Sequence, residues 1–136
     1  MVRGIYILGN DRVMDDAIAL LNSIRLHDPE TPIALIPYDE KYINLATVLV
    51  QKFNVQLYPN LELVDRISHR LHEIFGTEFF ARSNQFRKQA CWYGPFDEFL
   101  YIDTDIVVFE KIIDILNYLK DYDFLSCDYQ YKGGIT

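Results

Sequence analysis

The feature that most constrains the fold is a regular alternation of short apolar runs with segments of helical periodicity. Short runs rich in β-branched and aromatic residues predict strands, and apolar residues three or four positions apart predict helices. Strands are expected at residues 4–8, 33–36, 55–58 and 124–127 and in the run 99–109. Helices are expected at 13–24, 43–53, 61–75, 78–92 and 112–119. This alternation predicts an α/β fold with a doubly wound, mostly parallel sheet, whose ligands bind at the carboxyl ends of the strands.

Length and composition favour one globular domain that spans residues 1–136. The chain is 50% hydrophobic, and its formal net charge of −7 argues against nucleic acid or an anionic membrane as its main partner. Its two cysteines lack the spacing of a metal site or a disulfide framework, so we expect reduced thiols in a cytoplasmic protein. The sequence shows neither an apolar run of transmembrane length nor the apolar core of a secretory signal.

Two carboxylates lie inside an otherwise apolar run. Asp103 and Asp105 lie within residues 99–109, where burial of two like charges would be costly without a cation. At positions i and i+2, where the strand opens into a turn, both side chains can point the same way. Carboxylate oxygens suit Mg²⁺ or Mn²⁺, which usually keeps substrate phosphates among its other ligands. The run therefore predicts a site for a metal and a diphosphate, and the alternative is a loop with solvated aspartates between two strands.

The expected topology brings three strand exits to one edge of the sheet, at residues 9–11, 38–39 and 103–105, and we expect a nucleotide to lie across them. The first exit has one glycine, so it is not a dinucleotide-binding fingerprint, and the chain has no Walker loop. Side-chain cations are then needed to offset the negative charge of the phosphates. The helix expected at 78–92 carries three of them: Arg82, Arg87 and Lys88. For Arg87, a position on a solvated helix face is an equal alternative.

Four segments together resemble the nucleotide-sugar-dependent glycosyltransferases of the GT-A fold, in particular those similar to glycogenin and the bacterial galactosyltransferases. They are the opening strand that runs into Asn10 and Asp11, the end of the first helix at 21–27, the segment 88–92, and the acidic pair within 99–108. The resemblance implies that Asp103 and Asp105 hold Mn²⁺ or Mg²⁺ and, through it, the diphosphate of a nucleotide sugar, with a UDP-sugar preferred. It implies a donor site formed by Leu8, Asn10, Asp11, Tyr38, Asp39, Arg82, Lys88, Asp103 and Thr104.

Members of that family continue well beyond the acidic pair and supply a further metal ligand and the acceptor site there. Only residues 106–136 follow Asp105, so the resemblance implies a truncated GT-A domain without the usual C-terminal acceptor part, whose activity alone is open. We also expect self-association through the strand at 124–127. Two other functions compete with the transferase: a haloacid dehalogenase-like phosphatase with Asp103 as nucleophile and Asp105 as general acid and base, and a non-catalytic nucleotide-sugar-binding domain.

The remaining candidate residues favour structural roles. His69 and His72 alternate with arginines on the polar side of the third expected helix, so a surface position is favoured over metal ligation. Four aromatic residues are assigned to the core rather than to a sugar-binding platform: Phe79, Phe80, Phe86 and Trp92.

Overall fold

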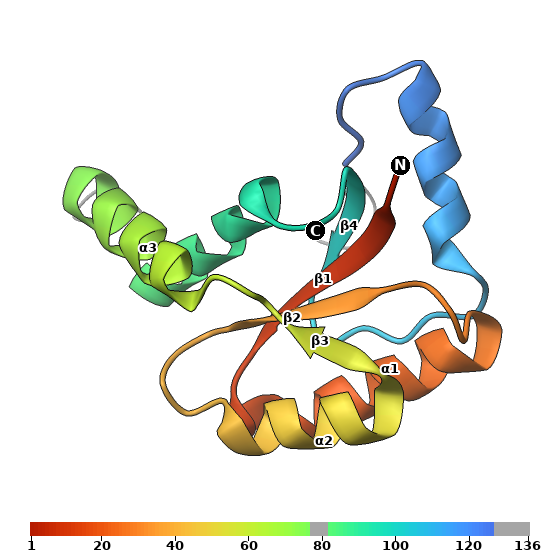
Figure 1. The fold of residues 1–136 in the computed structure, drawn as a ribbon, viewed down its shortest axis with the longest axis horizontal. Coiled ribbons are helices and arrows are strands. Elements are labelled where there is room, and N and C mark those ends of the chain that lie inside the picture. Colours follow the sequence, from red (N-terminus) through yellow and green to blue (C-terminus); the bar gives the residue numbers. More distant parts are fainter. Residues whose placement is uncertain (77–81, 127–136) are drawn as a thin grey trace, which may run out of the picture.

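Four parallel strands form one sheet in the computed structural model, which describes residues 1–76 and 82–126 (Figure 1). The strands are β1 (Arg3–Gly9), β2 (Ile33–Pro37), β3 (Val55–Leu57) and β4 (Glu98–Ile102). Their order across the sheet is β3-β2-β1-β4. Gly9 lies opposite Pro37, and Ile7 lies opposite Ile102, so β1, β2 and β4 end at the same edge. The predicted α/β fold with a parallel sheet is confirmed for the described residues.

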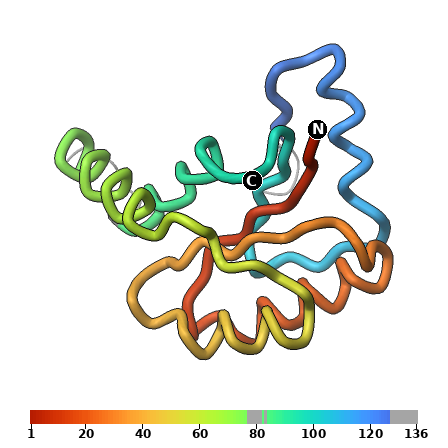
Figure 2. The backbone as a smooth tube through the Cα atoms, in the orientation of Figure 1, coloured from red at the N-terminus to blue at the C-terminus, as the bar shows by residue number. Residues whose placement is uncertain are grey.

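Helical segments cover both faces of the sheet, as the backbone trace in Figure 2 shows. They are η1 (Asp11–Val13), α1 (Met14–His27), α2 (Ile43–Phe53), α3 (Leu61–Phe75), η2 (Ser83–Tyr93) and η3 (Ile112–Lys120), where η denotes a 3₁₀-helix. Because side chains alternate along a strand, Ile5 and Ile7 of β1 face α1, α2 and η3, whereas Tyr6 and Leu8 face α3 and η2. Two apolar layers therefore enclose β1 and β2, whose residues are buried except for Arg3 at the start of β1.

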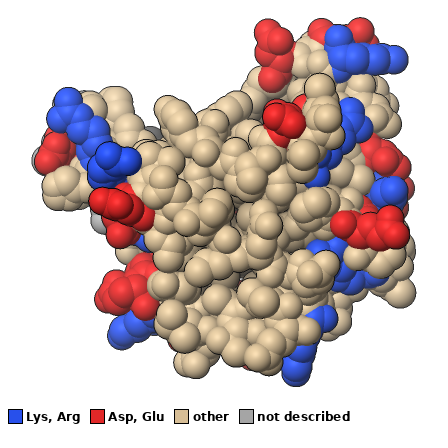
Figure 3. Space-filling view, in the orientation of Figure 1, with Lys and Arg blue, Asp and Glu red and all other residues tan. Residues whose placement is uncertain are grey.

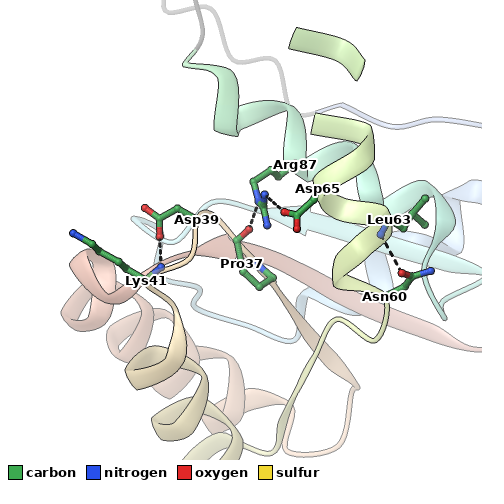
Figure 4. Close-up of polar contacts among 7 residues, drawn as sticks. All are labelled: Pro37, Asp39, Lys41, Asn60, Leu63, Asp65 and Arg87. Atoms are coloured by element: carbon green, nitrogen blue, oxygen red, sulfur yellow. Dashed lines mark hydrogen bonds and ion pairs between the residues drawn. The ribbon is translucent and has the colours of Figure 1, made fainter. Parts of the chain in front are cut away.

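Asparagines mark the ends of two of these helices. Asn54 follows α2 with φ of 54°, a left-handed conformation that asparagine tolerates and that redirects the chain into β3. The side chain of Asn60 accepts a hydrogen bond of 3.0 Å from the backbone N–H of Leu63 and so caps the start of α3 (Figure 4). Local sequence thus sets where α2 ends and where α3 begins.

The apolar run around the acidic pair is not one buried strand. β4 ends at Ile102, and β4 lies at the edge of the described sheet rather than at its centre. Beyond the turn, the side chains of Val107 and Phe109 are 51% and 86% exposed, so the expected burial is wrong there. The chain leaves the sheet instead and runs to α1, where the Val108 N–H donates to Ser23 Oγ at 3.0 Å.

Several other predictions are corrected in detail. The described part of the fourth helix is the 3₁₀-helix η2, and residues 77–81, with Phe79 and Phe80, lie outside the described residues. Trp92 is 56% exposed instead of buried, although its ring packs edge-on against Phe99. Phe86 is buried as predicted, and His69 and His72 are exposed as predicted.

The C-terminal strand is also corrected. Residues 124–126 are not a strand, Phe124 is 65% exposed, and Cys127 lies outside the described residues. Self-association through this region stays a prediction. Cys91 is a buried free thiol, as expected, and burial raises its pKa to about 11. Among the described residues, none of the helices combines the length and the apolar character needed to cross a membrane.

A polar cluster closes the end of the sheet opposite to the shared strand exits. The guanidinium of Arg25 donates to the carbonyl oxygens of Phe53 and Thr31, both at 2.8 Å, so it joins α1 to the end of α2 and the start of β2. The Asp28 carboxylate accepts hydrogen bonds from the N–H of Glu30 and from the N–H and hydroxyl of Thr31. Burial alone would raise the pKa of Asp28, but these hydrogen bonds outweigh burial and lower it.

Candidate functional site

A cleft opens where β1, β2 and β4 end. After β1 the chain builds the sheet in one direction through β2 and β3, and β4 then pairs on the other side of β1. Such a reversal is where α/β sheets commonly bind ligands. The cleft has a volume of ≈ 490 Å³. It is lined by Leu8, Gly9, Asn10, Arg12, Val13, Asp16, Tyr38, Asp39, Arg82, Gln85, Tyr101, Asp103, Thr104 and Asp105.

Most of the residues that the sequence predicts for one site line this one cleft. Among them are both aspartates of the acidic pair, although they come from a part of the chain more than sixty residues from the other strand exits. Asp11 and Lys88 are the two predicted residues that do not line it. The reason for the agreement is topological, because parallel strands place their carboxyl-terminal turns at a common edge.

The first two exits are held together by hydrogen bonds. Asn10 is 6% exposed; its Oδ1 accepts from the Arg12 N–H, and its Nδ2 donates to Asp39 Oδ2, both at 3.0 Å. Asp39 Oδ1 accepts from the Lys41 N–H at 2.9 Å (Figure 4). Since both oxygens of Asp39 are engaged, its carboxylate has a defined orientation toward the cleft.

The acidic pair projects from the turn that follows β4. Asp103 and Asp105 are both exposed, so the predicted cost of burying two like charges is wrong. A Cβ atom at Gly9 would lie 3.0 Å from Val13 Cγ2 and 3.1 Å from Leu45 Cδ2, whereas Thr104 Cγ2, at 3.7 Å, would be in ordinary van der Waals contact. The aspartates are therefore placed by the pairing of β4 with β1, and their exposed side chains line the cleft.

Tyr101 is a cleft residue that the sequence reasoning missed. Burial raises the pKa of Tyr101, and the Asp103 carboxylate, which accepts a hydrogen bond from the hydroxyl, raises it further. The available signal was its spacing, because residues i and i+2 of a strand lie on one face and Tyr101 precedes Asp103 by two. The phenol thus orients one carboxylate of the acidic pair.

Asp11 and Lys88 have other roles. Asp11 accepts hydrogen bonds from the Leu45 N–H at 2.7 Å and from Asn44 Nδ2 at 3.1 Å, so it holds the start of α2. Lys88 Nζ lies 5.9 Å from the centroid of the Tyr101 ring, and Lys88 is not among the residues that line the cleft. The lining of the cleft therefore does not support the prediction that Asp11 and Lys88 contact the nucleotide sugar directly.

Arg87 belongs neither to the cleft nor to a solvated helix face. Its side chain is 11% exposed, and it donates to the Pro37 carbonyl oxygen at 2.5 Å and to Asp65 Oδ1 at 2.6 Å (Figure 4). These contacts join η2 and α3 to the last residue of β2. Since Tyr38 and Asp39 follow at once, Arg87 supports the second strand exit from behind.

The cleft is acidic overall. Two arginines, Arg12 and Arg82, face four carboxylates, which are Asp16, Asp39, Asp103 and Asp105. Arg12 and Asp16 were not predicted, although their positions at the start of the helix that follows Asn10 place them beside the first exit. A phosphate entering the cleft alone would meet a net repulsion, whereas a divalent cation would be attracted.

No protein-family model matches the chain, and no curated protein matches its sequence.

Proposed function

We propose that the chain is a metal-dependent glycosyltransferase of the GT-A type that binds a nucleotide diphosphate sugar, preferably a UDP-sugar, in the cleft. The observation that supports this most is the meeting of Asp103 and Asp105 with Asn10, Tyr38 and Asp39 in one cleft at the reversal of strand order. Two accessible carboxylates beside polar groups from other strand exits suit a ligand that carries both phosphates and a nucleoside.

The metal ligands that the cleft offers suit Mn²⁺ or Mg²⁺. Within residues 1–76 and 82–126, no three His, Cys, Asp or Glu side chains come together as a metal-binding group, so the protein would offer the carboxylates of Asp103 and Asp105. Mg²⁺ is commonly bound by one or two carboxylates and keeps water and substrate phosphates as its other ligands. In the same described ranges neither aspartate has an ion-pair partner.

Each part of the cleft has a defined task in this proposal. The bound ion would neutralise the charge that develops on the leaving diphosphate. Arg82 adds a guanidinium that can donate to phosphate oxygens. Tyr101 orients the Asp103 carboxylate, and the hydrogen-bonded Asn10 and Asp39 present fixed polar groups to the nucleoside. These groups are organised before the ligand arrives, which is the condition for effective electrostatic stabilisation.

Calorimetric titration with UDP in the presence of Mn²⁺ tests the proposal. Wild type should bind UDP only with the metal, and Asp105→Ala should lose this binding while its circular dichroism and melting temperature stay near those of wild type. Asp123→Ala removes an exposed carboxylate outside the cleft lining and serves as the matched control. Unchanged Mn²⁺-dependent binding in Asp105→Ala would refute the metal site.

A second measurement separates the reaction classes. Metal-dependent release or transfer of sugar from a UDP-sugar supports the transferase. Release of inorganic phosphate from phosphomonoesters would instead identify the phosphatase, and metal-dependent UDP binding without turnover of either substrate would identify a non-catalytic binding domain.

A further inference from the structure

A second and larger hollow lies between α3 and η2. This groove has a volume of ≈ 950 Å³ and is lined by Arg66, Ile67, Arg70, Leu71, Phe75, Gln85, Phe86, Lys88, Gln89, Trp92 and Tyr93. Charged side chains gather at the periphery of the face shown in Figure 3, including the projecting α3 at its left. The acidic pair has no part in this groove, so a distinct ligand chemistry is expected.

Aromatic side chains dominate the groove. Phe86 is 7% exposed, whereas Phe75, Trp92 and Tyr93 are 44%, 56% and 68% exposed. Burial of apolar surface that is otherwise left in water at a concave site is favourable. Small-molecule sites typically combine such an apolar lining with a few polar groups that orient the ligand.

The polar groups of the groove are cationic. Arg66, Arg70 and Lys88 line it together with two glutamines, and none of the described lining residues is a carboxylate, in a chain whose net charge is −7. Arg70 pairs with Glu73 at 3.3 Å, but both side chains are largely exposed, and such pairs contribute little. Across residues 1–76 and 82–126, Arg66 and Lys88 have no ion-pair partner. The groove is therefore complementary to an anion that also carries an apolar body.

We propose that the groove between α3 and η2 is a second ligand site and that it binds an alkyl phosphate. The chain of the ligand covers the exposed rings, and its phosphate lies against the three cations. A phosphate fits them better than a single negative charge, because two guanidinium groups can each donate a pair of hydrogen bonds to its oxygens.

The groove adjoins the cleft, because Gln85 lines both. A ligand in the groove is thus a neighbour of a ligand in the cleft, which is the placement that a transfer between them requires. In such a transfer the alkyl phosphate would accept the sugar. This role as acceptor rests on the proposed function, whereas the binding of the alkyl phosphate to the groove does not.

The only tryptophan of the sequence provides the readout. Trp92 lies in the groove and is partly exposed, so its fluorescence should shift to shorter wavelength when a ligand covers it. We expect a saturable shift with monododecyl phosphate below its critical micelle concentration and none with inorganic phosphate. Dodecyltrimethylammonium and dodecyl maltoside should bind at least ~10-fold more weakly, since they lack the negative charge. Equal affinity for all three amphiphiles would overturn the proposal.

Charge variants complete the test. Arg66→Gln combined with Arg70→Gln should weaken monododecyl phosphate at least ~10-fold. The matched control, Lys52→Gln combined with Lys120→Gln, removes the same charge from exposed positions outside the lining and should bind as wild type does. Circular dichroism of both proteins checks that they are folded. Wild-type affinity for monododecyl phosphate in the Arg66 and Arg70 variant would overturn the proposal. If the wild-type protein bound monododecyl phosphate but not UDP, that result would count only against the proposed function.

Discussion

The cleft and the groove differ in almost every property, yet one 3₁₀-helix contributes to both. The cleft is acidic and is built from turns at strand ends, whereas the groove is apolar and cationic and is built from the sides of two helices. Along η2 and its first flanking residue, Arg82 serves the cleft, Lys88 serves the groove, and Gln85 lines both. The comparison shows that cations close in sequence can line different hollows.

Arg82 and Lys88 lie at different points along this segment. Arg82 has an extended backbone conformation and precedes η2, whereas Lys88 lies within η2. From the sequence, both cations were assigned to the phosphates of one ligand, because the chain has no glycine-rich phosphate-binding loop. In the structure, Arg82 lines the cleft and Lys88 lines the groove.

Separate substitution of these two cations gives the largest expected effect and tests directly whether the cleft and the groove are distinct sites. Arg82→Gln should weaken Mn²⁺-dependent UDP binding by ~10- to 100-fold, the loss of a hydrogen bond to a charged group, and leave monododecyl phosphate unaffected. Lys88→Gln should do the reverse. Calorimetry for UDP and Trp92 fluorescence for the alkyl phosphate measure both. If each variant weakened both ligands equally, the two hollows would form one electrostatic site.

Removal of the support behind the cleft should have the next largest effect. Arg87→Ala leaves the Pro37 carbonyl oxygen and Asp65 without their donor, so we expect a loss of ~1–2 kcal/mol in the free energy of unfolding. UDP affinity should fall as well, because Tyr38 and Asp39 follow Pro37. Urea unfolding and calorimetry are the measurements.

Asp65→Asn is the companion variant. It should cost less stability than Arg87→Ala, because the Asp65 side chain is 68% exposed and the guanidinium would keep its bond to Pro37. A larger loss in Asp65→Asn than in Arg87→Ala would place the support in the ion pair and not in the contact with β2.

Substitution of Tyr101 should have a smaller effect and tests whether its hydroxyl orients Asp103. Tyr101→Phe removes the hydroxyl that donates to Asp103, so Mn²⁺ affinity should fall by ~3- to 10-fold, in line with the loss of one hydrogen bond. The groove ligand should bind as before. Tyr118→Phe, at an exposed position outside both hollows, is the control. Manganese binding followed by electron paramagnetic resonance gives the affinities, and equal values for Tyr101→Phe and wild type would exclude an orienting role.

The smallest effect on either ligand is expected at the opposite end of the sheet. The pKa of Asp28 is below its ordinary value in the folded protein, so its carboxylate stabilises the fold above that ordinary value. This contribution is lost as the pH falls through the lowered pKa. Asp28→Asn should therefore cost ~1 kcal/mol at neutral pH. Its difference from wild type should shrink below about pH 4, while both ligands bind normally at neutral pH. Urea unfolding across this range is the test, and a difference independent of pH would contradict it.

Local pattern was enough to predict most strands, most helices and the polar exits. Gly9 and Asn10, Tyr38 and Asp39, and the acidic pair each end an apolar run, and turns at strand ends are encoded by their own residues. Parallel pairing then brings these ends together. For this reason the cleft was predictable before its geometry was known.

Burial and partner choice were decided by the tertiary structure. Val107 and Phe109 have the composition of a strand but no neighbouring strand in the described sheet, so they lie exposed beyond the turn. Asp11 was assigned to the nucleotide, yet the start of α2 lies within reach of its oxygens. Arg87 and Lys88 are adjacent in sequence, yet Arg87 donates to Pro37 and Asp65, whereas Lys88 lies over the Tyr101 ring. Periodicity and turn chemistry act over a few residues and can be read from the chain. Contacts between residues 50 positions apart, such as that of Arg87 with Pro37, exist only once the elements have packed.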